Sequence, residues 1–466
     1  MKIKHHEIEV VTDAPFTNCK LNREPYAKVL TEIVNSYADG FVLAINNEWG
    51  TGKTTFVKMW RQQLNNEGFQ TIYFNAWEND FNDNPLVALM SELKPLTKGI
   101  INGEKVFKSV VEKGAVLTKN VAPAIARSLI KKYIVDAIEN TTKAAAEILE
   151  EEIKEYSDKK KTITEFRTEL EKFVKKKGGN KPLIFIIDEL DRCRPNYAVE
   201  VLEQLKHFFS VNGIVFVLSI DKKHLASSVR GFYGSEKINT EEYLRRFIDL
   251  EYSIPRPSNK LFLKYLFDYY ELDKFFYSKE RIQYGELQSD ATDLLDVAEL
   301  LFNKTNPTLR QQEKIFGQTR LILNSFKPNQ YTFSHLLFVL IYIKTLQIEL
   351  YQKIENNALT IQELSDSFVS VMPLEIKNDY GRNLLYVVAL LLHFYNNNQE
   401  HQNRIQLLES GTDGNIATPI KIKLADNDSK KLAGLFKEIK QRSNYTDGSL
   451  KYLICRINLT ESVIIN

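Results

Sequence analysis

The eight residues Asn47-Glu48-Trp49-Gly50-Thr51-Gly52-Lys53-Thr54 combine the residue types that hold phosphate groups. They lie between a short apolar run at 41–45 and a helical pattern at 55–64, which predicts a turn from a strand into a helix. Gly50 and Gly52 let the backbone curl so that successive N–H groups face one point, and the helix N-terminus adds partial positive charge there. The sequence therefore predicts a Walker A phosphate-binding loop; a glycine-rich turn beside an unrelated lysine is the alternative.

Individual side chains of this loop have expected roles. We expect Lys53 to reach the β- and γ-phosphates and the Thr54 hydroxyl to complete the shell of a Mg²⁺ ion. Asn47 stands where the motif has its first glycine, and asparagine tolerates positive φ better than most residues. The segment's expected nucleotide-binding residues are Asn47, Trp49, Gly50, Thr51, Gly52, Lys53, Thr54 and Thr55.

A second candidate segment is the apolar run 183–187, which is followed at once by Asp188 and Glu189. A carboxylate at the end of a buried strand can hold Mg²⁺ through water, and its neighbour can polarise an attacking water. We therefore expect Asp188 to be a metal ligand and Glu189 to be catalytic. Strands also often end in solvated acids, which is the alternative interpretation.

Four further residues are candidates for sensing the nucleotide or acting on it, and each also has an ordinary structural interpretation. Ser219 lies at the end of the apolar run 214–220 and Asp221 lies just beyond it, where a polar group can sense the γ-phosphate, or end a strand and cap a helix. Arg246 is a candidate arginine finger that reaches the nucleotide of a neighbouring subunit, or a solvated surface residue. Arg310 is a candidate second nucleotide sensor, or a surface arginine.

The elements that must position these residues follow from hydrophobic patterning. Apolar runs at 41–45, 71–74, 183–187, 214–220 and 248–254 alternate with helical patterns, so we expect an α/β core with a parallel sheet covered on both faces. Between about 98 and 180 no strand signal appears, and apolar residues repeat at helical spacing at Ile125, Leu129, Tyr133, Ala137, Ile163, Phe166, Leu170 and Phe173.

The organisation expected is a P-loop core at 1–257, with the helical insertion at about 98–180, and a helical C-terminal region at 258–466. Capping boxes at Thr308 to Gln311 and Thr360 to Glu363 mark two helix starts in that region. The apolar stretches 336–343 and 384–392 are too short to span a membrane and are interpreted as buried helix segments. Asn396 to Asn398 and 411–414 are expected to be loops.

Composition excludes several classes of protein. The 466 residues carry 62 Lys and Arg against 60 Asp and Glu, a net charge of +2, so no global field drives binding to nucleic acid or a membrane. The three cysteines are too scattered for a disulfide framework or a metal site, which suits the cytoplasm. The histidines show no metal-ligand spacing.

Together these segments resemble the KAP family of P-loop NTPases. The resemblance rests on Leu21-Asn22-Arg23-Glu24, Trp49 to Thr54, Phe74-Asn75-Ala76-Trp77 with Pro85-Leu86, Asp188 to Cys193, Tyr243-Leu244 to Pro255, and Thr308-Leu309-Arg310. It implies an ASCE-type, AAA+-like ATPase core followed by a helical domain, with ATP preferred over GTP. Many members carry membrane helices in the core, but the charged insertion here cannot span a bilayer, so a soluble member is expected.

The family resemblance gives no definite chemical role to some of the side chains in these motifs. We expect Trp77 to pack against the core, with contact to the nucleotide site as the alternative. Asp191 and Arg192 are expected either to form a local ion pair or to touch a neighbouring subunit.

The leading hypothesis is a Mg²⁺-dependent ATPase that switches its helical half between states, within a homo-oligomer and with a protein effector. Family members occur in bacterial conflict systems, including phage exclusion, which implies a role in antiviral defence. The alternatives are a nucleotide-gated scaffold with little turnover and a DNA-handling motor; the near-neutral charge weighs against the motor.

Overall fold

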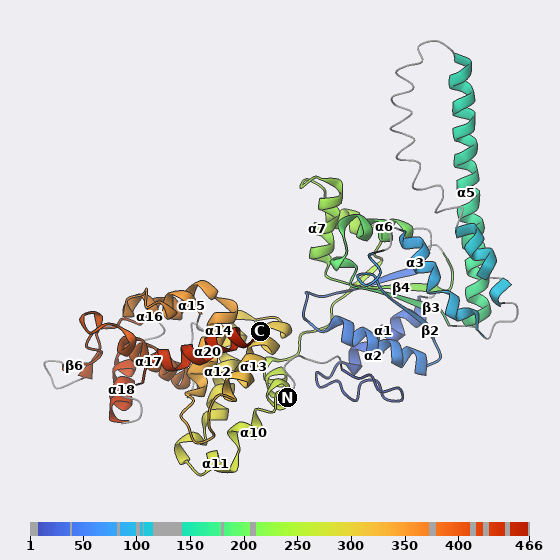
Figure 1. Cartoon of the computed structure of the whole chain (residues 1–466). Helices are drawn as coiled ribbons and strands as arrows, with labels where there is room; N and C mark the ends of the chain where they lie inside the picture. Colours follow the sequence, from blue (N-terminus) through green and yellow to red (C-terminus); the bar gives the residue numbers. More distant parts are fainter. Residues whose placement is uncertain are drawn as a thin grey trace. The chain divides into compact units, whose positions relative to one another are not determined.

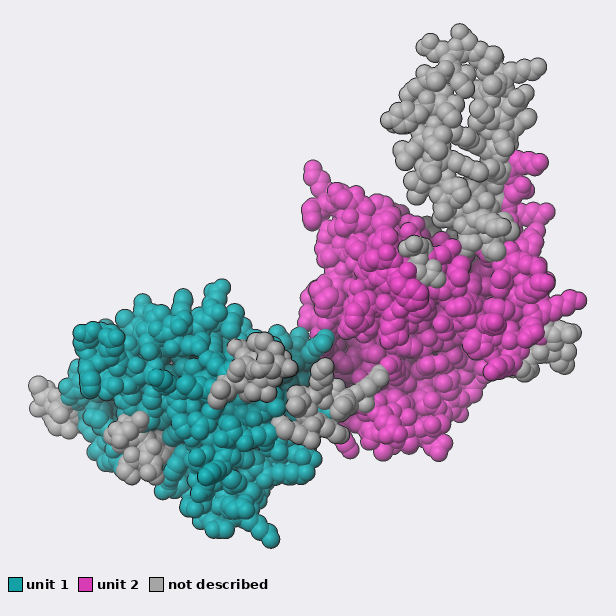
Figure 2. Space-filling model, in the orientation of Figure 1, with its two compact units in different colours: residues 1–7, 257–466 teal, residues 8–256 magenta. Residues whose placement is uncertain are grey.

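The computed structural model describes residues 8–37, 40–81, 84–98, 103–105, 107–114, 142–178, 181–205, 211–371, 379–410, 416–422, 428–442 and 448–464. The chain divides into two compact units, which Figure 2 colours separately: one ends at Arg256, and the other contains residues 257–466. Each unit is described by itself.

The first unit contains a parallel sheet of five strands in the order β2-β3-β4-β1-β5. The strands are β1 (Phe41–Asn46), β2 (Gln70–Asn75), β3 (Leu183–Asp188), β4 (Ile214–Ile220) and β5 (Leu250–Tyr252). This confirms the expected parallel α/β sheet, and β4 lies between β1 and β3, as in the ASCE layout that the resemblance implies.

Strand β5 is shorter than the apolar run 248–254 predicted, and side chains take part in its hydrogen bonding at both ends. The backbone N–H of Val42 donates to the Asp249 carboxylate at 2.9 Å. At the other end, the Asn47 side chain accepts from the backbone N–H of Ile254 and donates to its carbonyl, both at 2.9 Å. Only residues 250–252 pair with β1 as a strand.

Helices cover both faces of the sheet, because its strands are apolar on both sides. Figure 1 shows α1 (Glu24–Ser36) and α2 (Lys53–Asn66) on one face, where they pack on a cluster that contains Leu43 and Ile45. Val42 and Ala44 alternate to the opposite face. The helices on that face are α3 (Pro85–Ser91), α5 (Thr142–Gly178), α6 (Pro195–Leu205) and α7 (Lys222–Tyr233), and α8 (Thr240–Leu244) precedes β5.

Helix α5 is 37 residues long and reaches beyond the sheet in Figure 1. Its C-terminal turns bury Phe166, Leu170 and Phe173 in the core, as their helical spacing predicted. The insertion residues Ile125, Leu129, Tyr133 and Ala137 lie outside the described residues. Short 3₁₀ turns at Lys94–Thr97 and Leu190–Arg192 complete the unit.

The second unit is mainly helical. Its helices are α9 (Asn259–Tyr269), α10 (Asp273–Phe276), α11 (Lys279–Ile282), α12 (Asp290–Thr305), α13 (Leu309–Leu323), α14 (Ser334–Leu346), α15 (Ile348–Glu355), α16 (Ile361–Val371), α17 (Asp379–Asn398), α18 (Asp428–Gln441) and α20 (Leu450–Ile464). Two 3₁₀ turns lie at Gly285–Leu287 and His401–Asn403, and β6 (Glu409–Ser410) pairs antiparallel with β7 (Ile416–Ala417).

Both predicted capping boxes are present. Thr308 and Gln311 bond reciprocally at the start of α13, and Thr360 and Glu363 do the same before α16. The apolar stretches 336–343 and 384–392 lie in α14 and α17 as predicted, and almost all of their side chains are buried. Among the described residues, no helix is long and apolar enough to cross a membrane.

The prediction of a loop at Asn396 to Asn398 was wrong, since these residues form the last turn of α17. The amide of Asn396 bonds to the backbone of Ile405, and the amide of Asn397 donates to the carbonyl of Gly448 at 2.8 Å. Partners far along the chain therefore stabilise a turn whose amino acids favour loops. The expected loop at 411–414 lies outside the described residues.

Candidate nucleotide-binding site

The carboxyl ends of the parallel strands bring the sequence-predicted residues to one edge of the sheet. In the register, Asn75 pairs with Asp188, Asp188 with Ser219, and Ser219 with Ile45. The loop after β1 continues from the same edge, where the N–H of Asn47 donates to the carbonyl of Ile220 at 3.1 Å. The acidic residues and the glycine-rich loop are thus neighbours in space.

The loop has the backbone conformation that its glycines predicted. Gly50 and Gly52 have φ of 75° and 79°, in the left-handed region that favours glycine. Helix α2 begins at Lys53, two residues before the predicted start, so its N-terminal amides belong to the loop itself. The N-terminus of this 14-residue helix, next to such a loop, favours a bound anion.

Lys53 spans this loop. Its buried ammonium donates to the carbonyl of Asn47 and, at 3.3 Å, to the carbonyl of Glu48. Burial lowers the pKa of Lys53, and the nearby carboxylates of Asp191, Asp221 and Asp188 oppose that shift. A cation buried among carbonyls in this way is stabilised further by any anion that enters the loop.

Asn47 does not adopt a positive φ, so the expected reason why asparagine can replace the first glycine of the motif was wrong. Its backbone stays outside the left-handed region, and its side chain instead makes the two hydrogen bonds to Ile254 that end β5. The residue in the first glycine position therefore connects the loop to the edge strand.

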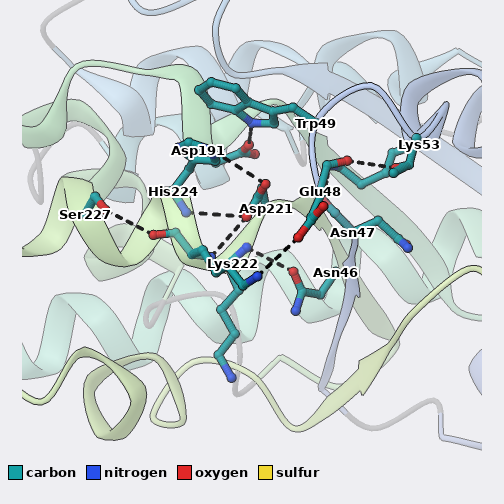
Figure 3. A network of polar contacts seen from close by, with 12 residues as sticks. Asn46, Asn47, Glu48, Trp49, Lys53, Asp191, Asp221, Lys222, His224 and Ser227 are labelled. Atoms are coloured by element: carbon teal, nitrogen blue, oxygen red, sulfur yellow. Dashed lines mark hydrogen bonds and ion pairs between the residues drawn. The ribbon is translucent and has the colours of Figure 1, made fainter. Parts of the chain in front are cut away.

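Trp49 and the residues around it form the network in Figure 3. The indole N–H donates to the carboxylate of Asp191, and the indole ring stacks on the imidazole of His224 with centroids 3.7 Å apart and planes 6° apart. Lys223 reaches Glu48 at 3.1 Å. The side chain of Trp49 thus holds the loop against α7, which leaves its peptide group available to a ligand.

Asp191 is a buried acid with an incomplete set of partners. One oxygen accepts from Trp49, while the other has no hydrogen-bond partner among the described residues. Burial raises the pKa of Asp191, and the Trp49 hydrogen bond and the Lys53 charge act against that rise. The Asp191 carboxylate therefore holds Trp49 with one oxygen and can still accept a hydrogen bond with the other, beside the loop.

Asp188 and Glu189 lie where the strand pattern predicted. Asp188 is 1% exposed; one of its oxygens accepts from the backbone N–H of Glu189 at 3.0 Å and the other from the hydroxyl of Tyr73 at 2.9 Å. Glu189 has φ of 61°, a conformation that is uncommon outside glycine and turns its side chain sharply from the strand direction.

Arg192 forms an ion pair with Glu189, 2.7 Å away, rather than with Asp191. Of the two expectations for Asp191 and Arg192, the local pair between them was therefore wrong, and contact with a neighbouring subunit stays a prediction. The second oxygen of Glu189 is 3.5 Å from the amide of Asn75. Burial raises the pKa of Glu189, and the Arg192 charge opposes the rise.

Trp77 was expected to pack against the core, but it is 54% exposed. The guanidinium of Arg192 lies 5.7 Å from its ring centroid and 5.9 Å from that of Trp49. Trp77 follows a tight turn in which the Asn75 side chain accepts from its backbone N–H, and this turn carries the indole out of the core. It belongs to the surroundings of Glu189.

Asp221 caps α7, accepting from the N–H groups of Lys223 and His224 at 3.1 and 3.4 Å, as one of the two sequence interpretations predicted. Ser219 is fully buried, and its hydroxyl has no partner among the described residues. A buried hydroxyl without a partner is uncommon, and this one lies on β4, between Asp188 and the strand that leads into the loop.

The two candidate arginines lie elsewhere. Arg246 is exposed in the turn before β5, and Asp249 bonds to Val42 at the start of β1. Six residues of strand β1, roughly 15 Å or more, therefore separate this turn from the phosphate loop. Arg310 is exposed in the first turn of α13, in the second unit.

Sequence reasoning gave no role to three residues that contact this site: Arg23, Tyr73 and Asn75. Arg23 contacts the loop from 28 residues upstream, a separation that carries no spacing signal. Tyr73 and Asn75 lie two residues apart on the same face of β2, and strand pairing with β3 could have placed them next to Asp188 and Glu189.

Solved structures give only weak similarity. The Aeropyrum pernix ORC2 protein, in ADPNP–ADP complexes, is 16% identical with a TM-score of 0.30, over 90% of this chain and 94% of that chain. A DNA replication initiation factor is 14% identical with a TM-score of 0.28, over 77% and 86%. Drosophila ORC bound to DNA is 12% identical with a TM-score of 0.27, over 96% and 86%. TM-scores this low do not establish a common fold, and none of the curated proteins matches the chain.

Family membership has a firmer basis. A family model described as the KAP family P-loop domain matches residues 23–374, more than half of the 466 residues. The match contains the loop at 47–54, the acidic strand end at 188–189 and the start of the helical unit. The chain belongs to the KAP family of P-loop NTPases.

Proposed function

We propose that this protein is a Mg²⁺-dependent ATPase whose cycle of binding and hydrolysis switches the helical unit between states. One observation supports this above the others: the register of the sheet aligns Asp188 with Ser219 on β4, and Ser219 with Ile45 on β1, the strand that leads into the glycine-rich loop; Glu189 follows Asp188 directly. Phosphate-binding amides, a metal-binding acid and a candidate base thereby lie at one edge.

The loop would hold the phosphates. Lys53 now bonds to the carbonyls of Asn47 and Glu48, and phosphate oxygens are stronger partners for an ammonium than these neutral groups. The first N–H groups of α2 have no acceptor in a preceding helical turn, so they can donate hydrogen bonds to a phosphate. Family membership supports ATP as the nucleotide.

The residues present suit magnesium. Among the described residues no cluster of three or more His, Cys, Asp or Glu side chains could hold a metal ion by itself. Mg²⁺ usually takes one or two protein oxygens and completes its shell with water and phosphate. Asp188 and the hydroxyl of Thr54 would be those ligands, and the ion would neutralise charge that develops on the phosphates.

Glu189 would accept the proton of the attacking water. Its partial burial raises its pKa, which makes its carboxylate a better proton acceptor than a fully solvated glutamate. The ion pair with Arg192 restrains it, so hydrolysis requires the carboxylate to leave Arg192.

Arg246 would act on another subunit. It lies at the far end of β1 from its own phosphate loop, so a direct role in catalysis needs a homo-oligomer in which it reaches a neighbour's nucleotide. Arg310 would sense nucleotide from the helical unit. These two roles are separable: Arg246→Ala should lose turnover alone and regain part of it when mixed with Lys53→Ala subunits, which supply an intact Arg246. Arg310→Ala should act within one chain, so the same mixing should not restore its turnover.

ATP turnover of the wild type and of Lys53→Ala and Glu189→Gln tests the proposal. We expect Lys53→Ala to lose binding and turnover, and Glu189→Gln to bind ATP while turnover falls by about 100-fold or more. Lys58→Ala, on the same helix but beyond the loop, is the matched control and should keep wild-type rates. Equal turnover in all four proteins would rule the ATPase out.

A second candidate function is a nucleotide-gated scaffold with little turnover. The observation that favours it is the engagement of both Glu189 oxygens, by Arg192 at 2.7 Å and Asn75 at 3.5 Å. ATP binding without multiple turnover, even with an added effector protein, would select the scaffold.

The biological role follows from the family only. We propose a cytoplasmic antiviral defence protein that controls an effector, consistent with three free cysteines among the described residues. Phage plating efficiency on cells that carry the wild type or Lys53→Ala, with neighbouring genes present, is the test; equal plating with and without the gene would contradict it.

A further inference from the structure

Arg23 contacts the phosphate loop from the start of α1. It directly precedes α1, its side chain is only 5% exposed, and its guanidinium donates to the carbonyl of Thr51 at 2.7 Å and to that of Gly52 at 3.1 Å. Helix α1 is in turn fixed to α2 by the hydrogen bond from the Trp60 indole to Thr31 at 3.0 Å. Arg23 is therefore held at a constant position relative to the loop.

These two hydrogen bonds set the direction of two peptide groups. In a trans peptide the C=O of one residue and the N–H of the next point in opposite directions. With the carbonyls of Thr51 and Gly52 turned toward Arg23, the N–H groups of Gly52 and Lys53 point away from it. Those are amides that a phosphate-binding loop must present to its ligand.

Within the part of the chain that the structure describes, no acid pairs with the charge of Arg23. Among the described residues it forms no ion pair, and its Nε has no hydrogen-bond partner. Burial lowers the pKa of the guanidinium, and the groups that oppose this are Cys19 and Tyr26 rather than a carboxylate. A buried cation without a counter-ion is costly, and an anion in the adjacent loop offsets that cost.

Gly52 completes the arrangement. A Cβ on this residue would lie 2.9 Å from Nη1 of Arg23, and its φ of 79° already disfavours other amino acids. The close approach of arginine to backbone thus depends on glycine here.

We propose that Arg23 is a positioning residue for the nucleotide: it holds the N–H groups of Gly52 and Lys53 toward the phosphates, and the polyphosphate supplies its missing counter-charge. This inference rests on the proposed function, since it assumes that the loop binds phosphate groups.

Hydrogen exchange without added nucleotide tests the positioning directly. The variants are Arg23→Met, which removes the charge and both donors, and Arg23→Lys, which keeps the charge. The matched control is Arg61→Lys, because Arg61 is a partly buried arginine on α2 that bonds to Thr71 instead of the loop. We expect exchange at residues 50–54 to rise by about tenfold in Arg23→Met, less in Arg23→Lys, and not in the control. Unchanged exchange at 50–54, or an equal rise throughout residues 8–256, would overturn the role.

Binding of ADP and of inorganic tripolyphosphate to the same proteins separates this inference from the proposed function. We expect Arg23→Met to weaken both by roughly 10- to 100-fold, Arg23→Lys to lose less, and Arg61→Lys to match the wild type. If the wild type binds but Arg23→Met binds equally well, the role of Arg23 is wrong. If the wild type binds neither probe, the nucleotide assignment is wrong, and the exchange experiment still decides whether Arg23 orders the loop.

Discussion

The carboxylate of Glu189 lies 2.7 Å from the guanidinium of Arg192, three residues further along the chain. Arg192 is in turn placed beside the exposed ring of Trp77 and the loop residue Trp49. The candidate base Glu189 thus forms an ion pair with a side chain that also contacts Trp49 of the phosphate loop. A movement of the loop can be transmitted to Glu189 through Trp49 and Arg192.

Arg192→Ala should raise basal ATP turnover by about fivefold, because a partly exposed ion pair of this kind contributes up to about 1 kcal/mol. Turnover against pH is the measurement, and the midpoint that reports Glu189 should move upward, since Arg192 opposes the raised pKa. Arg194→Ala, which breaks a bond to Asp80 instead, is the control. A large fall in turnover would mean that Arg192 positions Glu189 for catalysis.

Gly52→Ala should abolish tight nucleotide binding, whereas Gly68→Ala should not. Both glycines have positive φ, 79° and 84°, so both alanines strain the backbone by roughly 1–2 kcal/mol. Only at Gly52 does the new Cβ meet another group, Arg23, since nothing lies within 4 Å at Gly68. Titration of ADP, with melting temperatures recorded for both, separates the effects. Equal affinities in the two variants would contradict the close contact with Arg23.

Trp49→Phe should destabilise the first unit by about 1–3 kcal/mol, because it leaves the buried Asp191 carboxylate without its hydrogen-bond donor. The ring still stacks on His224, so the loss reports the N–H group. Combining it with Asp191→Asn in a double-mutant cycle should recover part of the loss, since the amide carries no charge to bury. Additive effects of the two changes in thermal unfolding would show that they do not interact.

Glu313 should make the stability of the helical unit depend on pH. Burial raises its pKa to about 7, with the Arg310 charge opposing the rise. The folded state therefore retains a proton that the unfolded state releases, and stability falls as pH rises from about 4.5 through 7. Melting temperatures between pH 5 and 8 should fall less in Glu313→Gln than in the wild type. The exposed Glu280→Gln is the control, and parallel curves for Glu313→Gln and the wild type would refute the assignment.

The sheet and the acidic strand end could be predicted because each depends on local pattern. Five apolar runs predicted five strands, and Asp188 and Glu189 follow a strand that is buried throughout. The glycines at 50 and 52 likewise predicted their own positive φ. In these cases the residue type itself indicates the local structure that the position adopts.

What could not be predicted depends on contacts between distant segments. The side chain of Asn47 ends β5, more than 200 residues away, so its identity could not be explained from loop chemistry alone. Trp77 is apolar yet exposed, because the Asn75 turn and Arg192 decide its place. Asn396 to Asn398 stay helical through bonds to Ile405 and Gly448. In these cases particular side-chain contacts, some within a few residues and others between distant segments, outweighed the preference of the residue type.

Helix α5 leads to the start of β3, the strand that ends at Asp188, and among its described side chains those of the C-terminal turns, with Phe166, Leu170 and Phe173, are anchored in the core. At 1.5 Å per residue its 37 residues extend over about 55 Å. The helix is therefore anchored near the edge of the sheet where β3 and β4 begin, and the amide of Asn212 donates to Glu171 there at 3.3 Å. A tilt of about 5° at this anchor displaces the N-terminal end of the helix by roughly 4 Å, so a rearrangement too small to disturb the sheet becomes a displacement large enough for another molecule to sense.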